Sequence, residues 1–126
     1  MTERLSKVLT LLKGNQKAIH YLYGRLFKIR PDLKEQYYER LCQGKMYDKM
    51  IDLLLSEPTD SEIKAVCETH AKLKLTCTEL HLYNTMFIDT AIEFCNKYLD
   101  RKTLRELYSA SDSIINQMAC TLKEIQ

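Results

Sequence analysis

Residues 58–83 read PTDSEIKAVCETHAKLKLTCTELHLY, and this stretch organises the rest of the chain. Thr59 and Glu62 have the Thr-x-x-Glu spacing of a capping box, with Pro58 just outside it, which predicts that a helix begins here. The imidazole of His70 shares one face of that helix with apolar side chains, because these residues recur at steps of three and four: Ile63, Val66, Cys67, His70 and Leu73. Such an imidazole can close a turn, sit in the core with one hydrogen bond, or ligate a metal.

The composition predicts a single domain over residues 1–126, long enough to bury about two-thirds of the surface that the unfolded chain exposes. Hydrophobic residues make up 45% and charged residues 29%, a mixture typical of soluble proteins. The net charge of +2 is spread along the chain, which argues against a nucleic-acid partner. Long apolar runs are missing, so neither a secretory segment nor a membrane partner is expected.

The cysteines indicate the compartment. Their number, five, is odd, and no two of them form a Cys-x-x-Cys pair. Free thiols in a reducing environment are therefore expected, which points to a cytoplasmic protein. The residues concerned are Cys42, Cys67, Cys77, Cys95 and Cys120.

The remaining signals predict an all-α protein. Period-2 alternation and hairpin turns such as Asn-Gly are missing, which argues against strands. Apolar spacing predicts a first helix that stops at residues 14–15 and a second over residues 16–29. Pro31 then starts what we expect to be only a short turn of helix, closed by Tyr37 and Tyr38.

The second half of the chain predicts longer helices. A methionine-rich helix over about residues 46–54 should end before Pro58 and precede the His70 helix. Thr76 or Thr78 can cap the next helix, which is apolar almost all round and therefore belongs in the middle of the bundle. The last helix is expected to begin near Asp100.

Two segments resemble the globin superfamily, in particular compact bacterial and truncated haemoglobins. LYGRLFKIRPDLKEQYY, residues 22–38, resembles their second and third helices, and ETHAKLKLTCTEL, residues 68–80, resembles the stretch that carries their haem-ligating histidine. The resemblance implies a globin-like helical bundle around a haem pocket, shortened relative to a full-length globin. It further implies that His70 is the proximal iron ligand of a b-type haem.

The resemblance also implies roles for the aromatic residues. Tyr23 would donate a hydrogen bond to a bound gas, assisted by Tyr83 or Tyr47, and Tyr37 would wedge against the porphyrin. On the far side of the iron, Met46 or Tyr47 would stand over the metal. Met50 or Ile51 would follow one turn further along the helix.

The physical requirements of haem can be compared with the residues. Haem is a flat apolar disc with a charged edge, so it needs two apolar walls, one nitrogen ligand and cations at its rim. The carbonyl of Val66, one turn before His70, could accept the hydrogen of the ring nitrogen that does not ligate. One wall is expected from Val66, Leu73, Leu75, Leu80 and Met86, and the other from Tyr37, Met46, Met50 and Leu54, with Lys49, Lys72 or Lys74 at the propionates.

Several functions are compatible with such a pocket. The resemblance implies a haem protein that reversibly binds a diatomic gas, oxygen or nitric oxide, and that has a reductase as a partner. Oxygen storage, gas sensing, nitric-oxide dioxygenase chemistry and peroxidase-like chemistry are all compatible with the pattern, so it does not decide whether the protein is an enzyme.

Two further interpretations remain open at this stage. One is a haem-free globin-fold sensor or protein-interaction module, in which the methionines only pack. The other is a zinc site built from Cys67, His70 and Cys77, which has a real Cys-x-x-His spacing but lacks a convincing fourth ligand. A hydrolytic function has less support, because the chain has no Gly-x-Ser-x-Gly nucleophile elbow.

Overall fold

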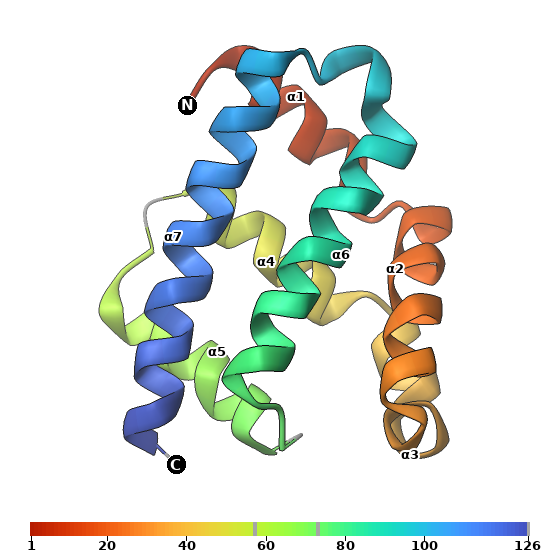
Figure 1. The fold of residues 1–126 in the computed structure, drawn as a ribbon, viewed down its shortest axis with the longest axis vertical. Coiled ribbons are helices and arrows are strands. Elements are labelled where there is room, and N and C mark those ends of the chain that lie inside the picture. The colour runs from red at the N-terminus through yellow and green to blue at the C-terminus, as the bar shows by residue number, and fades with distance from the viewer. Residues whose placement is uncertain (57, 73, 126) are drawn as a thin grey trace.

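The computed structural model describes residues 1–56, 58–72 and 74–125, and within these ranges it is all-α (Figure 1). The all-α class is therefore confirmed. Leu73, one of the expected wall residues, lies outside the described residues. The helices are α1 (Glu3–Leu12), α2 (Gln16–Ile29), α3 (Pro31–Cys42), α4 (Lys45–Leu55), α5 (Asp60–Lys72), α6 (Cys77–Cys95), the short 3-10 helix η1 (Asn96–Tyr98) and α7 (Arg101–Ile125).

Side-chain caps begin α5 and α6 where the sequence predicts them. At α5, the amide of Glu62 donates to the Thr59 hydroxyl at 3.2 Å, and the amide of Thr59 donates to the Glu62 carboxylate at 3.3 Å. Thr76 and Glu79 form the same reciprocal pair at α6, with both distances 3.2 Å. These capping boxes satisfy backbone N–H groups that have no partner within the helix.

Helix α3 is longer than the sequence predicts. The expected short turn was to close at Tyr38, but the helix continues through a segment that looked loose and ends at Cys42. Its two buried residues, Leu33 and Leu41, lie about two helical turns apart with polar and exposed residues between them. The apolar signal was therefore too sparse to reveal the last turn, which Leu41 anchors in the core.

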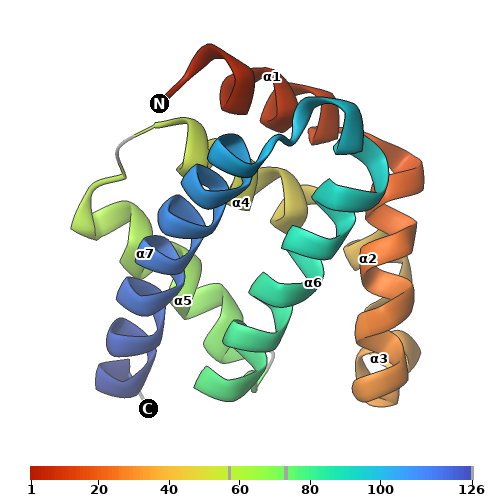
Figure 2. The same ribbon diagram turned by 45° about the horizontal axis from the view of Figure 1, so that its top comes forward.

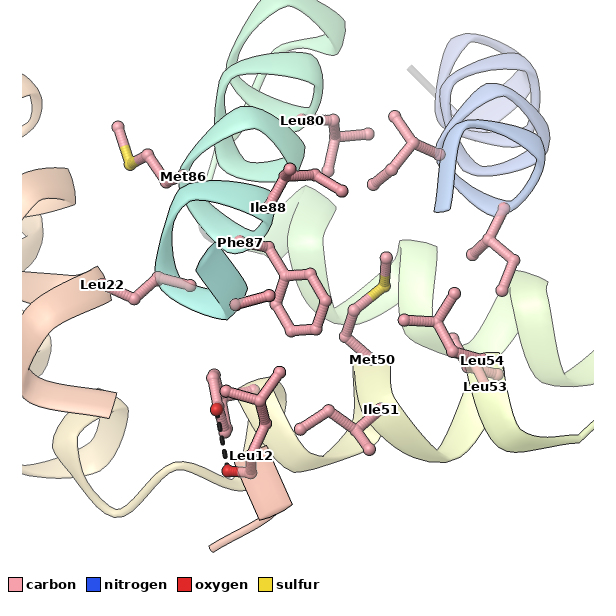
Figure 3. Packing of buried hydrophobic residues seen from close by; sticks show 14 of the residues in the cluster. Leu12, Leu22, Met50, Ile51, Leu53, Leu54, Leu80, Met86, Phe87 and Ile88 are labelled. Carbon is pink, nitrogen blue, oxygen red and sulfur yellow. Dashed lines mark hydrogen bonds between the residues drawn. The ribbon is translucent and has the colours of Figure 1, made fainter. Parts of the chain in front are cut away.

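Helix α6 lies in the middle of the bundle, as its apolar composition predicts, and packs against α1, α2 and α7 (Figures 1 and 2). Phe87 of α6 packs beside Met50 and Ile51 of α4, and Leu12 at the end of α1 closes this part of the core (Figure 3). Neither α6 nor any other helix in the described ranges combines the length and the apolarity that a membrane span requires.

The helix that carries His70 is attached mainly on one side. Helix α5 packs chiefly on α7, and it forms no interface of similar extent with α4 among the described residues. Figures 1 and 2 show α5 passing behind α7, with α4 higher in both views. The contact between α4 and α5 is therefore less extensive than the α5–α7 interface.

Gly44 allows the corner between α3 and α4 to approach α2. Its φ angle is +78°, a conformation that favours glycine, and a Cβ at this position would collide with the side chain of Ile19. Helix α4 starts at the next residue, so its first turn is held close to α2.

Candidate functional site

His70 lies in the last turn of α5 as a neutral imidazole with one free nitrogen. Its Nδ1 is 2.8 Å from the carbonyl oxygen of Val66, one turn earlier. A carbonyl oxygen only accepts hydrogen bonds, so Nδ1 carries the hydrogen and Nε2 keeps its lone pair. Burial lowers the pKa of His70 below its ordinary value of 6.5, and the bond to Val66 offsets this only in part.

A small apolar cavity of about 20 Å³ lies beside this imidazole. That volume is enough for about one water molecule. Helices α4, α5, α6 and α7 all contribute to its wall, so the cavity sits where four helices meet. The lining side chains are Met46, Met50, Leu53, Val66, His70, Leu80, Tyr83, Ile115 and Met118.

Most of this lining could be predicted from the sequence, but the contribution of α7 was missed. Ile115 and Met118 lie on the apolar stripe of the last helix, and a stripe shows which residues turn inward without showing which neighbour they meet. Leu53 of α4 was missed for the same reason.

The structure fixes the register of α4. Met46 and Met50 line the cavity with His70, whereas Tyr47 and Ile51 are fully buried on the core side of the helix. The hydroxyl of Tyr47 donates to the carbonyl of Leu12 at 2.8 Å. The placement of Tyr47 therefore differs from the expectation that it could stabilise a ligand, because its one hydrogen already has a buried acceptor in α1.

Met46 separates this cavity from a second one. The outer cavity has a volume of about 60 Å³ and includes Met46 in its wall. Arg40 and Lys72, both exposed, place two cationic side chains at its edge. Lys72 was among the expected rim cations and Arg40 was not, while the exposed Lys49 and Lys74 line neither cavity. The outer lining consists of Tyr37, Arg40, Leu41, Met46, Thr69 and Lys72.

Tyr23 and Tyr83 form a pair with buried hydroxyl groups, and Tyr83 lines the inner cavity. Their rings are 6.5 Å apart, and neither hydroxyl makes a hydrogen bond of regular geometry to a described residue, although the two hydroxyls interact and each affects the pKa of the other. Burial is the main cause that raises the pKa of both tyrosines well above the ordinary value, so both keep their hydrogen. Tyr83 lines the cavity with His70, whereas Tyr23 packs beside Tyr83 and does not line the cavity.

Some expected site residues lie elsewhere. Met86 is buried but projects from α6 on the side away from Leu80 (Figure 3), and the buried Leu75 lines neither cavity. Cys67 was expected on the same face of the helix as His70. Its thiol donates to the carbonyl of Met118 at 3.3 Å, so it faces α7.

The zinc interpretation finds no support in the geometry. Cys67 is directed at Met118, Cys77 donates to the carbonyl of Ala119 at 3.4 Å, and His70 is bonded to Val66. Within the described ranges, His, Cys, Asp and Glu side chains form no group of three that could hold a metal ion. All five cysteines are unpaired.

The donor set of the site consists of one neutral imidazole, thioether sulfurs and two tyrosine hydroxyls in an apolar surrounding, with cations at the outer edge. Comparisons with protein-family models, with curated proteins and with solved structures found no match.

Proposed function

We propose that the chain binds one b-type haem through Nε2 of His70 and a diatomic gas, oxygen or nitric oxide, on the other face of the iron. The observation that carries this proposal is the hydrogen bond from Nδ1 of His70 to Val66. It fixes the tautomer in which Nε2 is the free nitrogen of a ring that lines an apolar cavity, as a metal-bound histidine requires.

The walls needed to hold the disc come from opposite helices. Val66 lies on the α5 side with His70, and Met46 and Met50 lie on the α4 side. Leu80 of α6 closes the inner end. Arg40 and Lys72 stand at the outer cavity, where they would pair with the propionates.

Haem needs more space than the two cavities provide. Cofactor pockets typically measure about 300–1,000 Å³, whereas these cavities measure about 20 and 60 Å³. Uptake would therefore separate α4 from α5. The structure favours opening at this seam, because α5 rests chiefly on α7 and because the side chain between the two cavities, Met46, is unbranched and adaptable.

When bound, the haem iron would supply reversible coordination of the gas. Tyr83 lines the cavity, and its hydroxyl and that of the neighbouring Tyr23 make no hydrogen bond of regular geometry, so the pair has a hydroxyl hydrogen to offer a ligand. Partial negative charge on bound oxygen would attract such a donor, a contact worth roughly 1–3 kcal/mol. The buried pair therefore favours an oxygen-binding pocket over a purely structural core.

The helix order also supports a globin-like bundle, shortened relative to a full-length globin. Tyr23 lies on the second helix, His70 in the last turn of the fifth, and the long α6 and α7 pack together. The five unpaired cysteines are in keeping with a reducing compartment such as the cytoplasm. A reductase that keeps the iron ferrous would be the partner, and storage, sensing and nitric-oxide or peroxide chemistry all require the same pocket.

The test is haem titration of purified protein followed by absorption spectroscopy. Wild type should take up one equivalent, and His70→Ala should lose stable uptake. His81→Ala is the matched control, because His81 is exposed on α6 and lines neither cavity. Retention of the parental spectrum and affinity by His70→Ala would show that the proximal assignment is wrong. No uptake by wild type would favour the haem-free interaction module.

A further inference from the structure

Three of the chain's five methionines line the inner cavity together with His70. Met46 and Met50 come from α4, where they lie one helical turn apart, and Met118 comes from α7. With His70 of α5, three helices bring three thioethers and one imidazole to a space of about 20 Å³. Side chains that line so small a space lie close to one centre, as the ligands of a single ion must.

The cavity has the size of an ion. Its volume of about 20 Å³ has room for about one water molecule, and a bare metal ion is smaller than that. Met50 is 5% exposed and Met118 is 2% exposed, so an ion between them would be shielded from solvent. A methionine side chain is unbranched, with three rotatable bonds, which allows its sulfur to turn toward an ion without a shift of the backbone. The helices would therefore keep their places.

His70 presents the nitrogen that such a site requires. Its Nδ1 is bonded to the carbonyl of Val66 at 2.8 Å, which fixes the ring and leaves the lone pair on Nε2. A ligating histidine in proteins usually has such an acceptor on its other ring nitrogen. Thioethers carry no hydrogen, and the imidazole is neutral, so none of the four groups has to lose a proton in order to bind.

The types of donor favour Cu(I). Thioether sulfur is a soft ligand that selects this soft, univalent ion, and imidazole also suits copper. The other side chains of the described lining are uncharged: Leu53, Val66, Leu80, Tyr83 and Ile115. A dication such as Zn²⁺ would bring two charges into this apolar surrounding without a thiolate or carboxylate in the lining to balance them. A single charge costs less to bury.

We infer that the haem-free protein binds one Cu(I) ion in the inner cavity through Nε2 of His70 and the sulfur atoms of Met46, Met50 and Met118. The inference goes beyond the proposed function and does not rest on it. Binding forms bonds between the ion and its four ligands, with no change in the oxidation state of copper and no release of protons. Because both groups would use Nε2 of His70, Cu(I) and haem would exclude each other.

The experiment follows the isotope-labelled methyl groups of all five methionines by NMR in the whole, haem-free chain. Cu(I) is supplied without oxygen from a chelator that fixes its free concentration, so occupation is read at the site even where thiols bind further ions. Met118→Leu removes one proposed ligand with little change in volume. Met86→Leu is the matched control, because Met86 is buried on α6 but lines neither cavity. Circular dichroism verifies that each variant is folded.

The methyl signals of the three lining methionines should shift together as one ion binds, and the other two should stay in place. Met118→Leu should need at least about tenfold more free Cu(I) for half occupation, whereas Met86→Leu should match wild type. Copper uptake without shifts of the three signals would place the ion on the thiols and overturn the inference. Equal affinities of Met118→Leu and Met86→Leu would also overturn it. Haem titration is a separate measurement, so either result leaves the proposed function standing or falling on its own.

Discussion

Tyr47 of α4 donates its hydroxyl hydrogen to the carbonyl of Leu12, the last residue of α1, across 2.8 Å. Both residues are fully buried, so this bond ties two helices together inside the core. Tyr23 is buried to a similar extent, yet its hydroxyl makes no hydrogen bond of regular geometry to a described residue and interacts only loosely with the hydroxyl of Tyr83. The two tyrosines should therefore respond in opposite ways to loss of the hydroxyl group.

In protein without haem, Tyr47→Phe should lower the free energy of unfolding by about 1–2 kcal/mol, because the Leu12 carbonyl would be left buried without a donor. Tyr23→Phe should leave it unchanged or raise it by up to about 1 kcal/mol, because an unsatisfied buried hydroxyl is removed. Urea unfolding of wild type and of the two variants measures both changes in the free energy of unfolding. Equal destabilisation would show that Tyr23 has a partner after all, such as a buried water.

In the haem-loaded protein, Tyr23→Phe should speed oxygen release by about tenfold or more, because a lost hydrogen bond of 1.4 kcal/mol corresponds to a factor of ten. Carbon monoxide release should change less, since bound carbon monoxide carries less negative charge. Stopped-flow dissociation of both gases measures this. Tyr21→Phe is the control, since Tyr21 lies on the same helix but packs against Phe94. Unchanged oxygen release would mean that another tyrosine holds the ligand.

The stability of the haem-free protein should fall as the pH drops through the range just below 6.5, and His70 should account for part of the loss. Burial lowers the folded-state pKa of His70, so the unfolded chain binds more protons there. The free energy of unfolding therefore decreases as the pH falls through the unfolded value, and the loss ends below the lowered folded pKa.

His70→Leu should flatten this dependence, as measured by urea unfolding at several values between about pH 7.5 and about pH 5. The exposed His20 and His81 are present in both proteins, and so are all carboxylates, so their contributions cancel in the difference. The same slope in wild type and variant would show that the imidazole of His70 is not held neutral by burial.

Thiol counting on unfolded, unreduced protein should return five groups. In the native protein Cys120, which is exposed, should react first with a thiol reagent. Cys67 and Cys95 should react only as fast as the structure opens, because both are buried and burial raises the pKa of each thiol. A total below five would indicate a disulfide or a bound metal.

The helices could be predicted from local signals, where such signals exist. The bounds of α2, residues 16–29, follow from the helix-ending pair before it and from Pro31 after it. The start of α5 follows from its capping box, and of the two caps possible for α6 the structure uses Thr76. The end of α3 could not be predicted, because only the adjacent Leu41 and Cys42 hold its last turn against the core and they show no helical spacing of their own.

In the candidate site, the sequence predicted which residues share a helix face but not where every side chain points. The face of α5 that carries Val66 and His70 follows from helical spacing, and so does the bond between them. The direction of Tyr47 and Cys67 does not, because each is determined by a carbonyl acceptor on a distant helix, Leu12 in α1 and Met118 in α7. Spacing along one helix carries no information about such acceptors.

Gly44 helps to hold the α4 wall of the site more firmly than the α5 wall. Because α4 begins in contact with Ile19 and is also bonded through Tyr47 to α1, the wall that carries Met46 has little freedom to retreat. Helix α5 is attached chiefly to α7, so insertion of a flat group would displace α5 and strain its contacts with the C-terminal half of α7, where Cys67 meets Met118. A group inserted beside His70 would therefore change the packing of α7, a helix that lies far from His70 along the chain.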